Sequence, residues 1–516
     1  MDGAIYPDRP LASLLDEAPV NLGGYAALAE SAWMGSVQAT EILDSVHMGA
    51  ATKNLIERKP LSARLSNLAL REYGIREASL MMMVSFLLSA GLGAIRQVLF
   101  NAQFGTSLEA NAYYAAFRLP DVLFSLVAGG ALSSAMIPVL LRTVNQEGEV
   151  GGRRLASLVL SGLLAAFAAI VFIGELFTPA FVTRVLAPGF DPTTSQLAVK
   201  LTRIMLLQPL VLATGSVTIA ILNSRNQFFL TSLSVAAHNI ALISGILAVH
   251  LFPSIGIYGP TLGVVGGAVL QAVILLPGLV SSGGFLKLAW NPKDIHLREV
   301  IRLLIPNGLA VGVSYAGFIV DTAFATTAAQ AAGLAAIYNA WLLVGLPIAL
   351  LGQAVGQAAF PRLSAQAAAG DWQKMRSTLL TTLLAAIGLA IPALLALDWL
   401  GRPVIHLLFE HGKFDPVAGD LTYRILTTYA LALPAYVATE LISRGLIALL
   451  DTRTPLLTNT LQLGSRAIML IFLIPAIGVL GIPTAFAIAA AGETLLLGSV
   501  LGVKLQRRMV LVRRTT

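Results

Sequence analysis

The chain has 516 residues, of which 56% are hydrophobic and only 12% are charged, whereas about a quarter of the residues of a typical soluble domain are charged. This composition excludes a water-soluble globular protein and indicates a polytopic membrane protein. The net charge of +7 lies in short loops between apolar runs, so it is a topology signal and no nucleic-acid partner is expected. The absence of cysteine excludes disulfides and thiolate metal sites.

Residues 1–78 differ from the rest of the chain because they contain no long apolar run. They also lack the basic and apolar regions of a signal peptide. The segment 53–77 is basic and partly amphipathic. We therefore predict a cytoplasmic N-terminal extension, either poorly ordered in part or forming a helix along the membrane surface.

From residue 79 onward, apolar runs of about 20 residues or more, the length that crosses a bilayer, recur between short polar breaks. We predict twelve spans, at 79–102, 111–141, 155–178, 200–222, 228–251, 257–285, 299–327, 335–361, 375–397, 420–448, 455–476 and 481–503. Because only helices or closed barrels can span a membrane, these runs predict an all-α protein.

The positive charges of the loops orient these spans. Alternate loops contain most of the basic residues, including Arg142, Arg153, Arg154, Arg225, Lys287, Lys293, Arg298, Arg362, Lys374, Arg376, Arg453, Lys504, Arg507 and Arg508. The opposite set of loops contains only Arg184, Arg402 and Lys413 clearly outside the spans. The positive-inside rule therefore predicts that both termini are cytoplasmic.

Short motifs recur six spans apart. AMIPVLLR at the end of the second span resembles AAFPRLSA at the end of the eighth, and LTRIML at the start of the fourth resembles LTYRIL at the start of the tenth. An even separation gives both halves the same orientation, as in parallel-repeat transporters. We predict six-helix bundles at 79–285 and 286–505 around a central cavity, followed by a basic cytoplasmic tail at 506–516.

Four charged residues inside the spans are candidates for a site, because charge within a membrane is costly and is usually functional. Arg96 and Arg118 would form a cationic patch, with Asp121 as a nearby carboxylate. Arginine matches phosphate geometry, so the patch suits an anionic, phosphate-bearing substrate. Asp321 would either bind a coupling cation or pair with Arg96.

Four other charged residues are interpreted as structural pairs. Arg466 and Glu493 are expected at similar depth on adjacent antiparallel helices, where they would neutralise each other. Glu440 and Arg444 are separated by four residues on one helix, in the favourable acid-first order.

Several motifs in order resemble a known family. GAIRQVLFNAQFGTSLEANAYYAAFRLPDVLFSLVAGGALSSAMIPVL is similar to the first two helices of the MurJ/MviN family of lipid II flippases, which belongs to the multidrug, oligosaccharidyl-lipid and polysaccharide exporter superfamily. LREVIRLLIPNGLAVGVSYAGFIVDT, GLPIALLGQAVGQAAFPRLSAQAAAGDW, VIHLLFEHGKFD and ALLDTRTP look like later parts of the same family. The resemblance covers about residues 80–505.

The resemblance implies transport of a polyprenyl-pyrophosphate-linked peptidoglycan precursor across the cytoplasmic membrane by alternating access, with cavity arginines holding the pyrophosphate. Arg96 and Arg118 match basic residues of the family, and Asn111 stands where the family has an aspartate. The resemblance implies a divergent member, for which we expect no counterpart of the family's last two helices. Its sequence departs from the family's charged positions at Ala90, Phe124, Ser125, Gly129, Leu342 and Glu440.

We therefore predict a flippase in the bacterial cytoplasmic membrane, with a lipid-linked anionic substrate, membrane lipids and cell-wall synthesis proteins as candidate partners. Export of another lipid-linked oligosaccharide or amphiphile, and a transport-inactive membrane scaffold, are the alternatives. No enzyme activity, cofactor or metal is expected. A Na⁺ gradient, an H⁺ gradient and the membrane potential are all open as the driving force.

Overall fold

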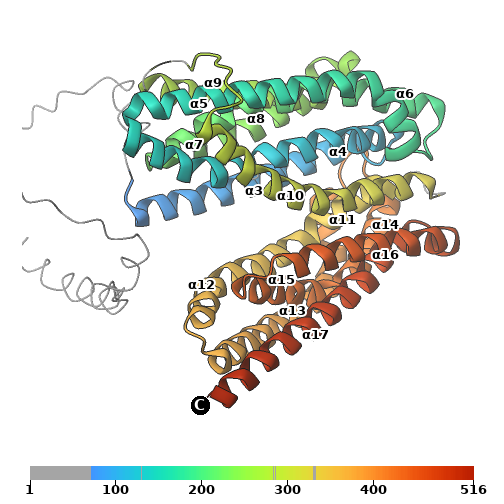
Figure 1. The fold of residues 1–516 in the computed structure, drawn as a ribbon. Coiled ribbons are helices and arrows are strands. Elements are labelled where there is room, and N and C mark those ends of the chain that lie inside the picture. Colours follow the sequence, from blue (N-terminus) through green and yellow to red (C-terminus); the bar gives the residue numbers. More distant parts are fainter. Residues whose placement is uncertain are drawn as a thin grey trace, which may run out of the picture. The chain divides into compact units, whose positions relative to one another are not determined.

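A computed structural model describes residues 71, 73–128, 131–282, 284, 286–328 and 333–515. Most of the predicted extension at 1–78 lies outside these residues. The helices are α3 (Ile75–Phe104), α4 (Leu108–Ala128), α5 (Ala131–Phe181), α6 (Pro192–Met205), α7 (Leu207–Ser224), α8 (Phe229–Leu251), α9 (Tyr258–Ser281), α10 (Ile295–Thr327), α11 (Gly333–Pro347), α12 (Val355–Ala368), α13 (Trp372–Phe409), α14 (Pro416–Ala430), α15 (Leu433–Ala448), α16 (Arg453–Ile477) and α17 (Gly481–Thr515) (Figure 1). Short π- or 3₁₀-helical turns are η3 (Val182–Leu186), η4 (Pro253–Ile255), η5 (Ile348–Ala354) and η6 (Gly478–Leu480).

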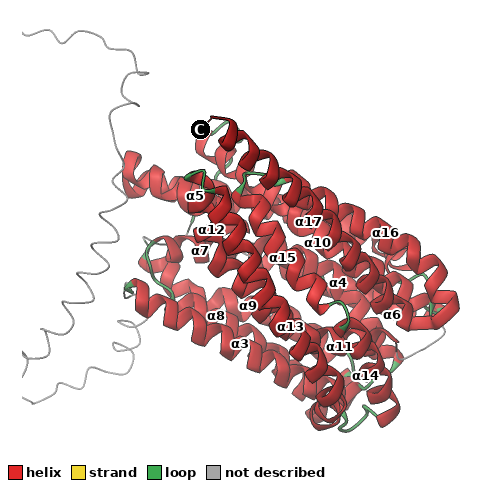
Figure 2. Ribbon diagram, turned by 90° about the horizontal axis from the view of Figure 1, so that it is seen from below, coloured by secondary structure: helices red, strands yellow, loops and turns green. Residues whose placement is uncertain are grey.

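The described residues form helices joined by loops, with no strand (Figure 2). Eight segments among them are long and apolar enough to cross a membrane, or nine if the bent pair α14–α15 is one span. Two of the eight, Leu132–Leu186 and Arg453–Val510, have 55 and 58 residues, although one crossing needs only about 20. The all-α, multi-pass membrane class is thus confirmed, whereas the count of twelve and the side of each terminus stay predictions.

Aspartates begin several of the helices that follow polar loops. Asp191, Asp294 and Asp415 are the N-caps of α6, α10 and α14, and each side chain accepts a hydrogen bond from backbone N–H groups of the first turn. These N–H groups have no partner within the helix, so the cap satisfies them. Asp451 accepts from the N–H of Thr454 at 3.1 Å. Burial alone would raise the pKa of Asp451, but hydrogen bonds from Lys504 and Thr454 lower it to about 2.

Helix α5 contains the turn between two predicted spans. Its backbone is interrupted at Gly148, where φ is 72° and ψ is −175°, a conformation that glycine adopts without steric cost. Apolar residues on both sides of this break, such as Val139 and Val159, belong to one buried cluster. The chain therefore reverses at Gly148, inside the basic loop that the sequence places between the second and third spans.

The helical pattern of residues 192–255 recurs later in the chain. Helices α6 and α14 begin at Pro192 and Pro416, an offset of 224 residues, and α8 and α16 keep the same offset. In both places the predicted span is broken, between α6 and α7 and between α14 and α15. Gly148 and Gly370 have φ values of 72° and 70° at corresponding turns. The structure thus repeats the arrangement that the motifs predicted.

Helices α7 and α15 also end in the same way. Asn226 and Leu450, the second residue after each helix, have φ values of 56° and 62°, and no other non-glycine residue in the described part of the chain has a positive φ. In each turn the next N–H group bonds back to the last helical turn, at 2.9 and 3.0 Å. This is the Schellman arrangement, in which glycine or asparagine is favoured. Leucine is unusual there.

Three buried apolar clusters position the two halves. The shared core contains residues from both halves, among them Phe100, Tyr114, Leu186, Ala336, Phe409 and Tyr429. The N-half core groups residues 132–160, 217–221 and 297–300, and the C-half core groups residues 363–379, 438–449 and 497–505. The shared core lies at the outer end, by which we mean the end opposite the basic loops. The halves therefore meet at the outer end. Toward the basic loops there are two cores, one in the first half, which includes the start of α10, and one in the second half.

Helix α10 contacts both halves. It packs against α4 and α5 as well as against α16. The predicted division of the membrane part at residue 285 therefore stays a prediction, since the first helix of the second predicted bundle is also part of the packing of the first.

Leu450 offers a test of the repeat. Its side chain is 92% exposed, so little packing is lost on replacement. Leu450→Asn copies the residue of the first repeat, and it should raise the stability of the purified protein by about 1 kcal/mol because the left-handed conformation strains a leucine. Thermal unfolding in detergent measures this change. The reciprocal Asn226→Leu should lower the midpoint, and a Leu450→Asn protein that melts earlier than wild type would contradict the explanation.

Candidate functional site

Arg118 on α4 is buried between the two halves. Its side chain is 8% exposed, and its Nε donates a hydrogen bond to Oγ1 of Thr322 on α10 at 3.1 Å. The guanidinium lies 5.3 and 5.6 Å from the ring centroids of Phe318 and Tyr338. Among the described residues, no carboxylate forms an ion pair with Arg118 within 4.0 Å. Arg118 is therefore a buried cation held by a hydroxyl and two aromatic faces.

The structure brings the other two predicted members of the cationic patch near Arg118. Asp121, one turn further along α4, is within electrostatic range of both Arg118 and Arg96. Arg96 on α3 is half-buried and, like Arg118, forms no ion pair with a described carboxylate. Two arginines and one aspartate leave this cluster with one formal positive charge. Its role in substrate binding stays a prediction.

Asn111 joins the two halves directly. It is 2% exposed, and its Oδ1 accepts a hydrogen bond from the backbone N–H of Ala335 in the first turn of α11, at 3.0 Å. Its Nδ2 donates to the carbonyl of Thr106 at 3.4 Å. The residue predicted as part of the substrate site is thus the side chain that caps a helix of the opposite half.

A buried network of amides, which the sequence interpretation did not single out, lies beside this cap. Nε2 of Gln97 is 2.7 Å from Oδ1 of Asn339 and 2.6 Å from the Tyr114 hydroxyl, and Nδ2 of Asn101 donates to Oδ1 of Asn339 at 3.0 Å. All four side chains are at most 3% exposed. We call them the amide network. The signal that could have revealed it was Gln97 and Asn101, two amides four residues apart in one apolar run, with Asn339 inside another.

The loop after α13 completes the contact at the outer end. The backbone N–H of Lys413 donates to the carbonyl of Ala102 on α3 at 2.8 Å. A Cβ on Gly412 would lie 2.3 Å from that same carbonyl, so only glycine allows this approach. The loop therefore packs main chain against main chain across the two halves.

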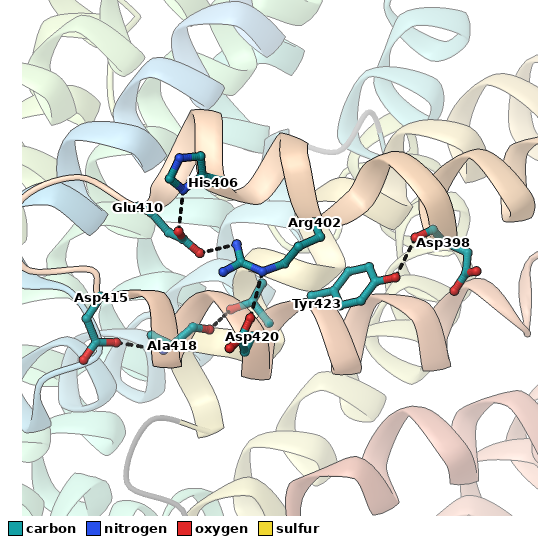
Figure 3. Close-up of polar contacts among 9 residues, drawn as sticks. Asp398, Arg402, His406, Glu410, Asp415, Ala418, Asp420 and Tyr423 are labelled. Carbon is teal, nitrogen blue, oxygen red and sulfur yellow. Dashed lines mark hydrogen bonds and ion pairs between the residues drawn. The ribbon is translucent and has the colours of Figure 1, made fainter.

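Ion pairs within the second half support this loop (Figure 3). Arg402 lies between Glu410 and Asp420, forming an ion pair with each, and the Asp420 contact measures 2.8 Å. Nδ1 of His406 is 2.6 Å from the other oxygen of Glu410. The Glu410 side chain is only 3% exposed. A buried carboxylate bonded on both oxygens fixes where α13 ends and the loop begins.

Arg466 does not pair with Glu493, so that prediction was wrong. Arg466 on α16 forms its ion pair with Asp321 on α10, and both side chains are 7% exposed. Glu493 on α17 accepts a hydrogen bond from Thr458 at 3.4 Å instead. Depth along neighbouring helices does not decide the pairing, because α10 also packs against α16 and brings Asp321 to Arg466.

The same ion pair corrects one interpretation of Asp321. Its partner is Arg466 and not Arg96, because Oδ2 of Asp321 contacts Nη2 of Arg466. Oδ1 of Asp321 is buried and has no hydrogen-bond partner. The predicted pair of Glu440 and Arg444 does form on α15, although its closest N–O distance is a loose 3.8 Å.

A cavity of about 420 Å³ lies beside this ion pair in the second half. It is lined from α10, α11, η5, α15, α16 and α17, with Asp321, Arg466, Glu440 and Glu493 among its residues. Arg96 and Arg118 do not line it. Phe318, on whose ring Arg118 lies, does line it. Across the described residues, no group of three or more His, Asp or Glu side chains is placed to hold a metal ion.

The chain has two helical halves with a repeated pattern. They meet at one end, and buried charges lie between them. These features define the class of membrane transporters that are built on two bundles. Several solved transporters share the fold. One described as an inward-facing multidrug resistance MATE family transporter of the MOP superfamily matches with a TM-score of 0.71 at 14% identity, over 84% of this chain and 99% of that chain. At that identity the likeness concerns the fold alone.

Comparison of the sequence with family models identifies one family within this class of transporters. The family model described as lipid II flippase MurJ matches residues 100–512, and the chain belongs to this family. A lipid II flippase MurJ from Burkholderia cenocepacia is 29% identical over 417 residues, 80% of each chain. A probable lipid II flippase MurJ from Rhizobium tropici is 27% identical over 402 residues, 77% of this chain and 75% of the relative. A structure described as lipid II flippase MurJ in an inward closed conformation has a TM-score of 0.70 at 26% identity, covering 82% of this chain and 87% of that chain.

Asn339 is the member of the amide network that can be removed most cleanly. Asn339→Ala deletes the acceptor of two hydrogen bonds, each worth about 1 kcal/mol, so the outer contact should open more often. A single cysteine at Ala335, which is fully buried, reports this opening through its labelling rate with a membrane-impermeant thiol reagent. The chain has no native cysteine to interfere. Equal labelling rates with and without Asn339→Ala would show that the network does not hold the halves together.

Replacing only one partner of the ion pair between Asp321 and Arg466 should lower the stability of the protein strongly. Asp321→Asn leaves a buried guanidinium without its counter-charge, for which we expect a loss of about 3–5 kcal/mol. Replacing both residues by leucine should cost less, since no charge is then left buried. Thermal unfolding of both variants in detergent compares them, and a double variant that is less stable than Asp321→Asn would refute this account.

Proposed function

We propose that the chain is a flippase that moves a polyprenyl-pyrophosphate-linked peptidoglycan precursor, of the lipid II type, across the cytoplasmic membrane. Its membership of the MurJ family and the names of its relatives in Burkholderia cenocepacia and Rhizobium tropici support this proposal. We assign the anionic head group to the N-half cluster of Arg96, Arg118 and Asp121.

The assignment rests on Arg118, which is buried without an ion pair in the described part of the chain. Burial of a charge without a counter-ion is costly, and among the described residues Arg118 has a hydroxyl and two rings around it but no ion pair. A pyrophosphate would supply the missing negative charge, and the planar guanidinium can donate two parallel hydrogen bonds to it.

The distribution of the cores supports alternating access. The halves share a core at the outer end and have separate cores toward the basic loops. In the proposed cycle this form accepts the substrate from the basic-loop side. Opening of the outer end would separate Arg118 from Thr322 and the members of the amide network from one another, so the bound anion would compensate the freed guanidinium.

The driving force is proposed to be the membrane potential. Asp321, the candidate for a coupling cation, already has the guanidinium of Arg466 as its counter-charge. A coupling cation would have to compete with that guanidinium. A charged head group that crosses the membrane, in contrast, responds to the potential directly, by about 2.3 kcal/mol per charge for each 100 mV.

Growth of a bacterium depleted of its own lipid II flippase tests the proposed function. Expression of this chain should restore growth, and Arg118→Gln should abolish the rescue because glutamine removes the charge. Arg298→Gln, at an exposed position in the first turn of α10, is the control and should rescue like wild type. Rescue by Arg118→Gln at wild-type level would remove Arg118 from the substrate site, and no rescue by a well-expressed wild-type chain would overturn the proposed substrate.

A further inference from the structure

The cavity of the second half differs in charge from the N-half cluster. Three carboxylates and one guanidinium line it, from Asp321, Glu440, Glu493 and Arg466, so its formal charge is −2. Its volume of about 420 Å³ is in the range of small-molecule sites. An anionic head group would be repelled by this lining, so the cavity requires a different ligand.

Two of the carboxylates have little compensation from the protein. Glu493 is 9% exposed, and its only hydrogen bond within the described residues is the long one from Thr458, at 3.4 Å. Glu440 meets Arg444 at only 3.8 Å, and Arg444 itself does not line the cavity. Oδ1 of Asp321 is also buried without a hydrogen-bond partner. The cavity thus contains one buried acceptor oxygen without a donor in the described part of the chain and two carboxylates with only weak partners.

Aromatic rings form much of the remaining wall. Tyr315, Phe318, Trp341, Tyr436 and Phe486 all line the cavity. The centroids of neighbouring rings are 5.5–5.7 Å apart, from Tyr315 through Phe318, Trp341 and Phe486 to Tyr436. Rings of this kind attract cations to their faces through the electron density of the π system.

The guanidinium of Arg466 already lies against this aromatic wall. Arg466 lies 5.1 Å from the ring centroid of Phe486 and pairs with Asp321. One aromatic face and one carboxylate therefore already hold a cation at one side of the cavity. Glu493, Trp341 and Tyr436 offer the same combination with no ion pair from the protein among the described residues, and Glu440 beside them has only the loose contact with Arg444.

We propose that this cavity is a binding site for an organic cation, an ammonium or phosphonium group whose apolar substituents contact Trp341, Tyr436 and Phe486 and whose charge faces Glu440 and Glu493. The site is separate from the arginines to which we assign the pyrophosphate. It serves either a free lipophilic cation or the amino group of a larger lipid-linked substrate, and the chemistry of recognition is the same.

Equilibrium binding of tetraphenylphosphonium to the purified full-length chain in detergent tests the site. Tetraphenylborate, which has the same shape and the opposite charge, is the matched probe and should bind at least about tenfold more weakly, a factor that corresponds to 1.4 kcal/mol. Glu493→Gln and Glu440→Gln should each weaken tetraphenylphosphonium binding by about tenfold or more, because each keeps the side-chain size and removes one charge.

Glu299→Gln is the matched control variant, since Glu299 pairs with Arg142 away from the cavity and its loss should leave binding unchanged. Trp341→Leu is a second test that does not change charge, and it should weaken binding through the lost aromatic face. Thermal unfolding of every variant separates lost binding from lost folding. Equal binding of the two probes, or wild-type binding by folded Glu493→Gln and Glu440→Gln proteins, would overturn the proposal.

Competition identifies the source of the cation. A polyprenyl-pyrophosphate-linked compound with a free primary amine should displace tetraphenylphosphonium if the site receives the substrate's amino group, and the same compound with the amine acetylated should not. If neither compound competes while tetraphenylphosphonium binding depends on Glu493, the site receives free organic cations. These results are independent of growth rescue, so failure of the proposed lipid substrate and failure of the cation site can be told apart.

Discussion

A charged or amide side chain buried within a membrane protein must find its partner inside the protein, since the surrounding lipid offers none. In this chain the partners are found across the boundary between the two halves. Asn111 caps a helix of the opposite half, Gln97 and Asn101 bond to Asn339, and Arg118 bonds to Thr322. The requirement to satisfy these groups therefore also fixes how the halves meet.

The same requirement explains what the sequence could predict. Runs of apolar residues are local, so the spans were placed on helices, and the repeated motifs predicted the repeat. They gave no sign of the break that α6–α7 and α14–α15 share. Pairing is not local. Arg466 was assigned to Glu493 from depth alone, whereas its ion pair is with Asp321, on a helix more than a hundred residues earlier. Only the packing of α10 against α16 decides between these carboxylates.

In the candidate site, too, the local features could be predicted from the sequence and the non-local ones could not. The proximity of Arg96, Arg118 and Asp121 follows from two adjacent helices, and the structure has it. The cavity of the second half could not be predicted, because its lining comes from six elements between residues 313 and 493. Asp321, Glu440 and Glu493 lie in different predicted spans, and both glutamates were assigned to pairs with arginines, so the sequence did not indicate that the three carboxylates share one cavity.

The composition of the amide network has a consequence for how the outer contact responds to its surroundings. Its members are three neutral amides and one phenol, and the neighbouring loop contact uses backbone groups alone. Neutral amides neither titrate near physiological pH nor bind counter-ions, in contrast to carboxylate–guanidinium contacts, which salt screens. Once the contact opens, water replaces each lost hydrogen bond at a net cost of only about 1 kcal/mol. The amide network itself is thus insensitive to acidity and ionic strength, and each of its hydrogen bonds is weak enough for a bound ligand to replace.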